Sequence, residues 1–350
     1  MHINEAIKNT HRIFPMQGRY DYMRYDMNEN PEGLPKEFVE KVKGEITAEF
    51  LSIYPEPDRF LGKYAEYMGV SVDNVVATNG SDMAIRYLLE TFGERGKNVV
   101  TVTPSFEMYW VNCNILGYKH VPVVYNDDWS MDINNILEAI DDDTRIVVLL
   151  NPNNPMGNVY SEEEAETVIK KADKVGAIVI VDEAYYYYYD KTFLPFVKKY
   201  NNVAILRTFS KLFSIAACRL GVITGSKELI KYVKNAKLTF DANAIALLFA
   251  ERLLDNPDIE KQLIATEKAG REYTLEVLGE HGYECHNCRG NFIFVKPHTN
   301  AHDVAKRLKN EHRLLVKTFS NPLLKEVIRV STGSKKTMEK FVELFLRCDK

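Results

Sequence analysis

Short apolar runs alternate with amphipathic stretches along the first two thirds of the chain, from about residue 73 to residue 224. Four of the runs have the length and the branched aliphatic side chains of strands that are buried on both faces of a parallel sheet. These runs are residues 74–78, 99–102, 145–150 and 177–181. Between them the apolar side chains recur at helical spacing, as at 162–171, where Ser161 precedes an acidic first turn. The alternation predicts a parallel sheet wrapped by helices.

The last third of the chain has a different pattern. After Lys227 a long helical stretch continues toward Leu278, and the short apolar runs 291–295 and 327–330 then predict strands of a smaller domain. We expect a large domain at 28–240 and a small domain made of 1–27 and 241–350. The five tyrosines at 185–189 are expected to alternate between faces at the end of a strand and beyond it.

Composition and charge exclude several classes of protein. A chain of 350 residues, 45% hydrophobic, is long enough for two domains. Its formal net charge of −4 provides no basic field for nucleic acid. No apolar stretch reaches the ~18 residues of a membrane span, and no N-terminal secretory pattern is present. We therefore expect a cytoplasmic protein that acts on small molecules, without a nucleic-acid or membrane partner.

The five cysteines are mostly scattered, which is typical of a reducing compartment. Cys285 and Cys288 have the two-residue spacing of half a zinc knuckle, but no second pair follows at a suitable spacing. We expect a hairpin or loop there, and no metal.

Candidate chemistry centres on Lys211. Hydroxyl side chains surround this lysine, and Arg219 follows eight residues later. A site for pyridoxal phosphate (PLP) needs these groups, because the lysine amine forms a Schiff base and the others bind the phosphate. Asp182 ends a predicted buried strand, where ligands of open α/β sheets bind, and can pair with the pyridine nitrogen. Tyr185 and Asn154, the latter from a turn rich in Asn-Pro pairs, can reach the phenolic oxygen.

A second anion site is predicted where the strand at 74–78 meets the helix that begins near Ser81. Asn79-Gly80 joins the two, and the N–H groups of a helix start attract a phosphate. The alternative is an ordinary N-cap by Ser81 or Asp82. Phe106 follows the strand at 99–102 and can stack on a flat ring, or can simply belong to the core.

These segments, with three further ones, resemble a known family. The motifs are Tyr54-Pro55-Glu56-Pro57, Asn79 to Asp82, Pro104 to Phe106, Asn151 to Gly157, Val181 to Tyr185, Thr208 to Arg219 and Ile328 to Val330. In this order they resemble the class I/II aminotransferases of PLP fold type I, and most of all the histidinol-phosphate aminotransferase group. The resemblance runs from Asn28 to Gly333. It implies an α/β fold with a mostly parallel seven-stranded sheet between helices, a smaller α+β domain, PLP as cofactor, and a homodimer with shared active sites.

The resemblance also implies roles for single residues. Lys211 would form the Schiff base and shuttle protons, Asp182 would hold the pyridine nitrogen, and Phe106 would stack on the ring. Asn154 and Tyr185 would bind the phenolic oxygen. The residues implied for the phosphate are Gly80, Ser81, Asp82, Thr208, Ser210 and Arg219, with Tyr54 reaching the phosphate in the neighbouring subunit. Arg329 would grip the substrate carboxylate.

Two departures concern the substrate. Histidinol-phosphate aminotransferases usually have an arginine where this chain has Lys317, and lysine lacks the fork that matches phosphate oxygens. Residues 14–22 also lack the usual Pro-Tyr pair. We therefore expect glutamate as amino donor and a small phosphorylated amine or amino acid as the other substrate, with histidinol phosphate a weak one. The candidate residues for binding the phosphorylated substrate are Lys317, Arg19, Tyr20, Tyr22 and Arg24. The last four can equally lie on the surface.

Other classes fit less well. A nicotinamide dehydrogenase needs Gly-x-Gly-x-x-Gly, which is absent, and residues 221–227 miss the P-loop spacing by one residue. Regulators with an aminotransferase-like domain carry an N-terminal DNA-binding domain, for which the residues before Asn28 leave no room. A decarboxylase of an O-phospho amino acid uses the same cofactor contacts and stays open as the alternative.

Overall fold

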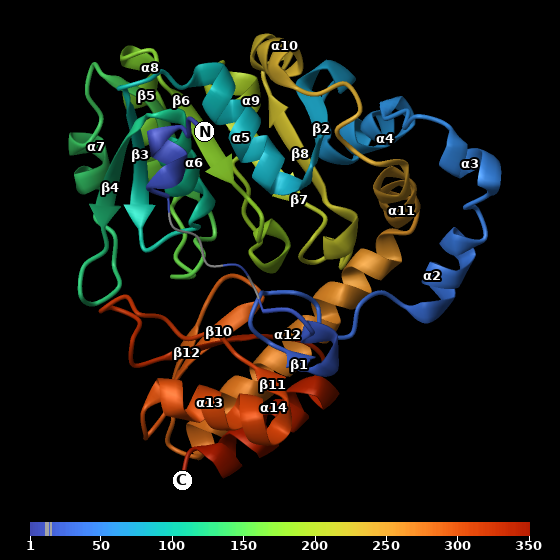
Figure 1. Cartoon of the computed structure of the whole chain (residues 1–350), viewed down its shortest axis with the longest axis vertical. Coiled ribbons are helices and arrows are strands. Elements are labelled where there is room, and N and C mark those ends of the chain that lie inside the picture. The colour runs from blue at the N-terminus through green and yellow to red at the C-terminus, as the bar shows by residue number, and fades with distance from the viewer. Residues whose placement is uncertain (11–13, 15) are drawn as a thin grey trace.

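The computed structural model of the chain describes residues 1–10, 14 and 16–350, so Pro15 of the divergent N-terminal segment lies outside the described residues. Its largest element is a seven-stranded sheet in the order β2-β8-β7-β6-β5-β3-β4 (Figure 1). The strands are β2 (Val75–Asn79), β3 (Asn98–Thr103), β4 (Lys119–Val124), β5 (Thr144–Leu150), β6 (Ile178–Asp182), β7 (Val203–Thr208) and β8 (Leu220–Gly225). Strands β7, β6, β5, β3 and β4 pair in parallel, and only β8 runs antiparallel to its two neighbours. The predicted mostly parallel sheet is confirmed.

Helices cover both faces of this sheet because its central strands are apolar on both sides. Ile146 and Ile178 contribute to the core under α5 (Gly80–Phe92), α6 (Met108–Leu116) and α10 (Lys227–Ala236). Val147 and Val179 contribute to the opposite core, under α7 (Ile133–Glu138), α8 (Glu162–Lys174) and α9 (Phe196–Lys199). Helix α8 begins as predicted, with a capping box between Ser161 and Glu164.

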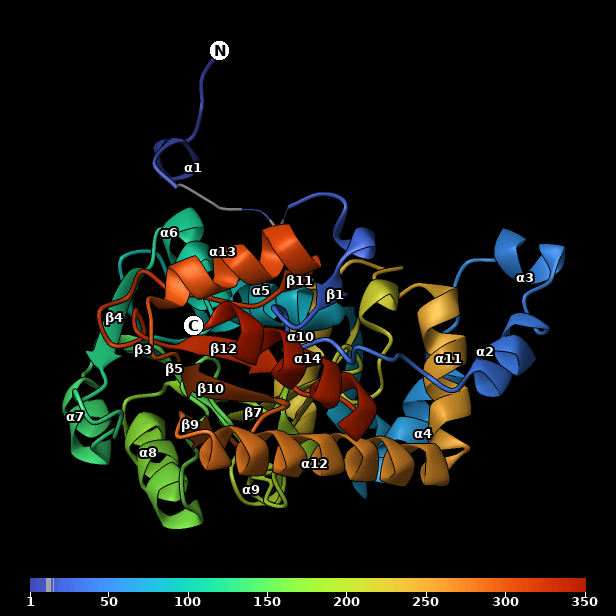
Figure 2. The same ribbon diagram turned by 90° about the horizontal axis from the view of Figure 1, so that it is seen from below.

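The helical stretch after Lys227 is three helices rather than one. They are α10, α11 (Ala244–Leu254) and α12 (Pro257–Glu280). Asn243 caps α11 through its side chain, and Pro257 opens α12, where its missing N–H costs no helical hydrogen bond. Figure 2 shows α12 as the long helix that runs along one side of the molecule.

The alternation expected for residues 185–189 is wrong. Tyr186–Tyr188 form a 3₁₀ helix, η3, directly after the β6 strand end. The Tyr186 ring lies against the Arg207 guanidinium, with its centroid 3.6 Å from Cζ, and Tyr187 is buried. Packing on Arg207 therefore overrides the strand-like pattern at this point.

A smaller antiparallel sheet lies beside the large one, in the order β12-β10-β9 (Figure 1). Its strands are β9 (Glu284–Asn287), β10 (Phe292–Lys296) and β12 (Ile328–Ser331), and its helices are α13 (Ala301–His312) and α14 (Lys335–Cys348). Strand β1 (Met23–Arg24) pairs in parallel with β11 (Leu314–Leu315), which joins the N-terminal segment to this part. Cys285 lies on β9 and Cys288 follows it, so the expected hairpin is confirmed.

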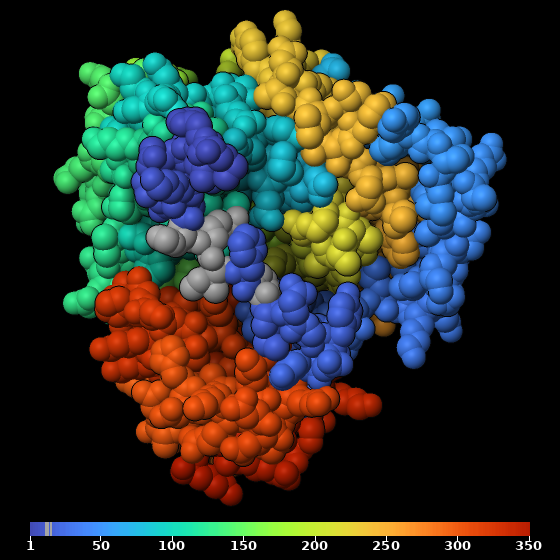
Figure 3. Space-filling view, viewed as in Figure 1, coloured from blue at the N-terminus to red at the C-terminus, as the bar shows by residue number. Residues whose placement is uncertain are grey.

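The remaining α-helices are α1 (Glu5–Lys8), α2 (Lys36–Lys43), α3 (Ala48–Ser52) and α4 (Asp58–Met68). Of these, α1 packs against α6, and α4 packs against α11 and β2. Figures 1 and 3 show α2 and α3 as an arm at one side of the molecule. Within the described part of the chain, no helix combines the length and the apolar character that crossing a membrane requires.

Candidate active site

The carboxyl end of β6 carries a buried acid. Asp182 is the last residue of the strand and is 2% exposed. Its carboxylate accepts hydrogen bonds from the Tyr109 hydroxyl (2.9 Å) and from the Ala184 N–H (3.1 Å), which are both neutral donors. Burial raises the pKa of Asp182 to about 6. The site therefore holds a buried carboxylate whose hydrogen-bond partners among the described residues supply no positive charge.

Lys211 lies in the loop that follows β7. Phe209, Leu212 and Phe213 of this loop are buried, and the rings of Phe209 and Phe213 stack with centroids 4.8 Å apart. These anchors leave Lys211 half-buried between them. Its Nζ donates a hydrogen bond to the Met27 carbonyl oxygen (2.9 Å) and lies 5.6 Å from the centroid of the Tyr185 ring. The loop thus brings the amine next to the tyrosine that follows β6.

The segment Asp26–Asn28 contacts three of the predicted site residues. The Met27 carbonyl accepts from Lys211, and Asn28 Nδ2 donates to the Tyr185 hydroxyl (2.9 Å). The Asp26 carbonyl accepts from Arg329 Nη2 (2.8 Å). Residues from the N-terminal segment, β6, the β7 loop and β12 therefore meet at one place.

A cradle for an anion forms where α5 begins. Gly80 has a φ of +71°, and a Cβ atom at this position would lie 2.6 Å from Arg219 Nη2. Arg219 pairs with Asp82 (3.0 Å) and donates to the Ser210 hydroxyl (3.4 Å). Gly221 faces the same turn, since a Cβ there would lie 2.6 Å from the Ser81 nitrogen. The first-turn N–H groups of α5, Ser210 and Arg219 therefore lie close together, because glycine at positions 80 and 221 lets the Arg219 side chain and the β8 backbone approach the start of the helix.

Arg329 on β12 is a buried cation, 6% exposed. Its guanidinium donates to Asn154 Oδ1 (2.5 Å) and to the Asp26 carbonyl (2.8 Å), and these acceptors are neutral. Burial lowers the pKa of Arg329. Lys317 is paired with it through the main chain, by two N–H to carbonyl bonds of 3.0 and 2.8 Å, while the Lys317 side chain is exposed. The pairing places an exposed amine beside a buried guanidinium.

Other predicted residues lie at varying distance from this centre. Thr208 ends β7, and its hydroxyl accepts from the Ser210 N–H (3.1 Å). Phe106 is half-buried against the core that contains Tyr109. Tyr54 is 71% exposed and its ring stacks on Phe240 with centroids 4.2 Å apart. Tyr20 is 92% exposed, and the Arg24 guanidinium carbon lies 5.9 Å from the centroid of its ring.

A buried ion pair ties together the strand ends that carry the site. Arg207 Nε and Nη2 donate to Glu183 Oε2 at 2.9 and 2.8 Å, and both side chains are at most 3% exposed. Glu183 directly follows Asp182, and Arg207 lies near the start of the Lys211 loop. Thr192 and the Phe193 N–H also bind Glu183, so the carboxylate is fully engaged. The pair fixes the distance between the β6 and β7 ends.

Comparison with known protein families identifies the kind of enzyme to which this arrangement of residues belongs. The family model for aminotransferases of class I and II matches residues 20–345. The chain belongs to this family. It is a PLP-dependent aminotransferase, as the motifs had indicated.

Two relatives of this aminotransferase and one solved structure carry the same name. The chain is 32% identical over 319 residues to the histidinol-phosphate aminotransferase of Caldanaerobacter subterraneus subsp. tengcongensis, covering 90% of this chain and 89% of the relative. It is 30% identical over 328 residues to that of Clostridium novyi, covering 93% and 91%. A solved histidinol-phosphate aminotransferase from Sinorhizobium meliloti, in complex with pyridoxal-5'-phosphate, matches its fold with a TM-score of 0.88, at 21% identity over 99% of this chain and 98% of the other.

The residues present fit PLP. The group at Gly80 has the N–H, hydroxyl and guanidinium donors that a phosphate needs, and the Lys211 amine lies near the buried Asp182 end of the sheet. Asp182 lacks a cationic partner among the described residues, and a protonated pyridine nitrogen would supply one. The donor set therefore matches the phosphate, the aldehyde carbon and the ring nitrogen of the cofactor.

Two residues of the site had not been identified from the sequence. Tyr109 holds Asp182 from helix α6, and Asn28 holds the Tyr185 hydroxyl from the N-terminal segment. Tyr109 has no local signal, because an aromatic residue in an apolar helix normally belongs to the core. Asn28 lies in Asn28-Glu29-Asn30-Pro31, which marked the start of the resemblance but carried no argued role.

Proposed function

We propose that this aminotransferase moves an amino group between glutamate or 2-oxoglutarate and a small phosphorylated amine or amino acid. The observation that carries the proposal is a pair of buried charged side chains whose hydrogen-bond partners among the described residues are neutral. Asp182 is a buried anion bound by neutral donors, and Arg329 is a buried cation bound by neutral acceptors. A pyridinium and a substrate carboxylate would complete the two pairs.

The catalytic roles follow from the placement of the side chains. PLP, when bound, supplies the electron sink that makes the substrate α-proton acidic. Lys211 Nζ accepts that proton and then returns it to complete the proton transfer. The buried residues of its loop hold the amine beside Tyr185, where it can do so. Asp182 keeps the ring nitrogen protonated, and Tyr109 orients Asp182. Tyr185, held by Asn28, binds the phenolic oxygen.

The remaining cofactor contacts are part of the same proposal. Asn154 would donate its Nδ2 to the phenolic oxygen, together with the Tyr185 hydroxyl, while its Oδ1 keeps the contact with Arg329. Phe106 would stack on the ring. The N–H groups of Gly80, Ser81 and Asp82 would hold the phosphate, with Thr208, Ser210 and Arg219 around it.

The charged side chains near Arg329 and in the N-terminal segment support a phosphorylated second substrate. Arg19 is neutralised, because its guanidinium binds Asp26 (2.7 Å) and Glu29 (2.9 Å). Arg24 approaches Glu29 less closely, at 3.7 Å, and Lys317 has no acidic partner among the described residues. Lys317 is therefore a cation beside Arg329 without an ion-pair partner among the described residues. Its ammonium group would bind the distal phosphate of the substrate as a point charge, without the paired N–H donors that arginine offers. Tyr20 would gain a contact when the substrate is bound.

A second copy of the chain completes the site in this proposal. Tyr54 is 71% exposed, and large apolar side chains near it in sequence or against its ring are exposed as well: Leu51 63%, Ile53 56%, Leu238 65% and Phe240 53%. An apolar exposed group of this kind is typical of a subunit interface. The homodimer would bury it and bring Tyr54 to the cofactor phosphate of the neighbouring subunit. The domain boundaries 28–240 and 1–27 with 241–350, and the cytoplasmic location, belong to the same proposal.

Half-reaction kinetics test the function. The holoenzyme is mixed with glutamate and the release of 2-oxoglutarate is measured over one turnover, after which histidinol phosphate and other phosphorylated amines are screened. We expect glutamate to be a donor, histidinol phosphate to react weakly, and Lys317→Arg to improve it. Release of CO₂ from an O-phospho amino acid with no keto product would overturn the proposal in favour of decarboxylation. A specificity constant for histidinol phosphate above about 10⁴ M⁻¹s⁻¹ would show that lysine suffices at position 317.

A further inference from the structure

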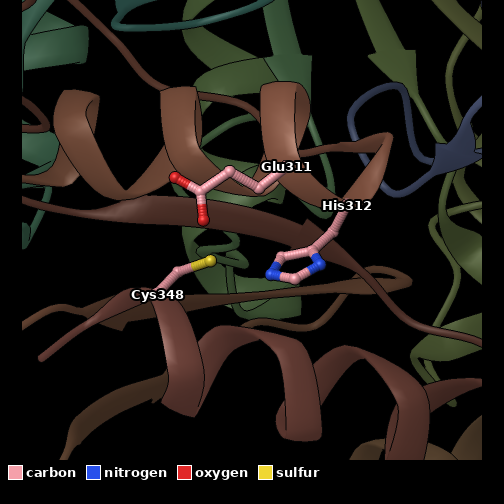
Figure 4. A group of neighbouring side chains, drawn as sticks. All are labelled: Glu311, His312 and Cys348. Carbon is pink, nitrogen blue, oxygen red and sulfur yellow. The ribbon is translucent and has the colours of Figure 1, made fainter.

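Three potential metal ligands converge at the far end of the small sheet's helices (Figure 4). Glu311 and His312 are the last two residues of α13, and Cys348 is the last residue of α14. These helices pack against each other, and the carboxylate, imidazole and thiol atoms all lie within 4.8 Å of one another. Figure 4 shows the three side chains directed toward a common space. The group is the only one of its kind in the described part of the chain.

The three side chains are available as ligands. No hydrogen bond or ion pair joins any of them to another described residue. Cys348 is 3% exposed, whereas Glu311 is exposed and His312 is half-buried. The thiol therefore forms the floor of the group, and an ion can enter past the carboxylate and the imidazole.

We propose that Glu311, His312 and Cys348 bind a thiophilic divalent transition-metal ion, and that Zn²⁺ is the ion that matches them best. Thiolate, imidazole and carboxylate are the side chains that bind Zn²⁺ in proteins, whereas Mg²⁺ and Ca²⁺ prefer oxygen ligands alone. Bonds of about 2.0–2.3 Å place tetrahedral ligand atoms ~3.5 Å apart. The group must therefore contract by about 1 Å, which rotation of the outer two side chains supplies. A water molecule takes the fourth, solvent-facing position.

Binding must displace a proton. Burial and the Glu311 carboxylate raise the pKa of the Cys348 thiol, while Arg307 acts in the opposite direction. The S–H proton leaves to solvent as the sulfur–metal bond forms, so affinity rises with pH. Arg307 repels the ion and Glu343, which interacts with His312, attracts it. The bound ion would tie the C-terminal ends of α13 and α14 together, apart from the Lys211 cleft.

Metal titration of the holoenzyme with matched variants tests the site. After chelation and dialysis, the protein is titrated with Zn²⁺ against a chromophoric chelator, and with Co²⁺ while absorbance is followed beyond the cofactor bands. We expect one ion per chain, tetrahedral Co²⁺ bands, and a higher Tm with Zn²⁺. Because loss of an outer-shell partner alone costs about 10–100-fold in affinity, Cys348→Ser and His312→Gln should each weaken binding by ~100-fold or more.

Two controls separate the site from adventitious binding. Cys285→Ser removes another cysteine of the same region, and His302→Gln removes another histidine of α13; both should bind Zn²⁺ as the parent does. The Tm without metal shows that each variant is folded. Parent-like Zn²⁺ affinity in Cys348→Ser or His312→Gln overturns the proposal, as does the absence of stoichiometric binding by the parent.

Discussion

Replacing Asp182 with asparagine should stabilise the protein without its cofactor while removing its activity. The carboxylate is buried with neutral partners, and burial raises its pKa from 3.8 to about 6. The folded state therefore holds the proton more tightly than the unfolded state, so the stability that this proton confers is complete below about pH 4 and lost as the pH rises to about 6. At 1.36 kcal/mol for each pKa unit, the ionised side chain costs up to about 3 kcal/mol above pH 6.

Asparagine has the same shape and avoids this cost. Its Oδ1 can still accept from the Ala184 N–H, and its amide can donate to the Tyr109 hydroxyl oxygen. Urea unfolding of the apoprotein at pH 8 should show Asp182→Asn more stable than the parent by roughly 2–3 kcal/mol, and the gain should shrink to about half at pH 5. PLP binding should be weaker in the variant and turnover should fall by several orders of magnitude.

Asp349 provides the matched control. Its carboxylate accepts from the Thr299 hydroxyl and from the His298 and Thr299 N–H groups, and its pKa is lowered despite burial, because these hydrogen bonds favour the ionised form. Asp349→Asn should therefore destabilise the protein at pH 8, opposite in sign to Asp182→Asn. If Asp182→Asn leaves the apoprotein equally stable or less stable at pH 8, with no dependence on pH, the argument from an uncompensated buried charge is refuted.

Three further changes probe the site. Glu183→Gln leaves the buried Arg207 unpaired and should cost about 3–5 kcal/mol of unfolding free energy, much of it regained when Arg207→Met is added; urea curves that show additive losses would contradict this. Gly80→Ala should raise the PLP dissociation constant by about tenfold or more, since its Cβ would displace Arg219. Gly62→Ala, where an added Cβ meets nothing within 4 Å, should leave that constant unchanged, and equal effects would argue against the cradle. Arg329→Lys keeps the charge but loses the two parallel N–H donors of the guanidinium. Single-turnover kinetics with glutamate should therefore show a fall in kcat/KM that corresponds to about 2–4 kcal/mol of lost transition-state stabilisation. Parent-like kinetics would contradict the role of Arg329 in binding the substrate carboxylate.

The sequence predicted most reliably those parts whose signal is local. Strands β5 and β6 are buried on both faces, so their residues form continuous aliphatic runs that few other elements produce. The breaks at Asn243 and Pro257 also had local signals, a side-chain cap and a proline at a helix start, but apolar spacing across them concealed the ends. Only tertiary packing explains the 3₁₀ turn at 186–188, because Arg207 lies on a different strand.

Long-range contacts account for the part of the site that sequence reasoning missed. Asn28 and Tyr185 are 157 residues apart, and Tyr109 and Asp182 are 73 residues apart. No periodicity or spacing connects such pairs, since Tyr109 reaches Asp182 from a helix that packs on the large sheet, and Asn28 reaches Tyr185 from the N-terminal segment. The same holds for Arg329, whose carboxylate role came from resemblance, and whose buried setting among neutral acceptors only the structure shows.

Borohydride reduction of the holoenzyme, followed by peptide mapping, tests the central claim most directly. Reduction fixes PLP to the lysine that holds it, and mass spectrometry of the digest identifies that residue. We predict a single modified peptide with the cofactor on Lys211, and no fixation in Lys211→Ala, which should also be inactive. Cofactor fixed to a different lysine of the parent protein, or a protein that takes up no PLP at saturating concentration, would contradict the assignment of the site.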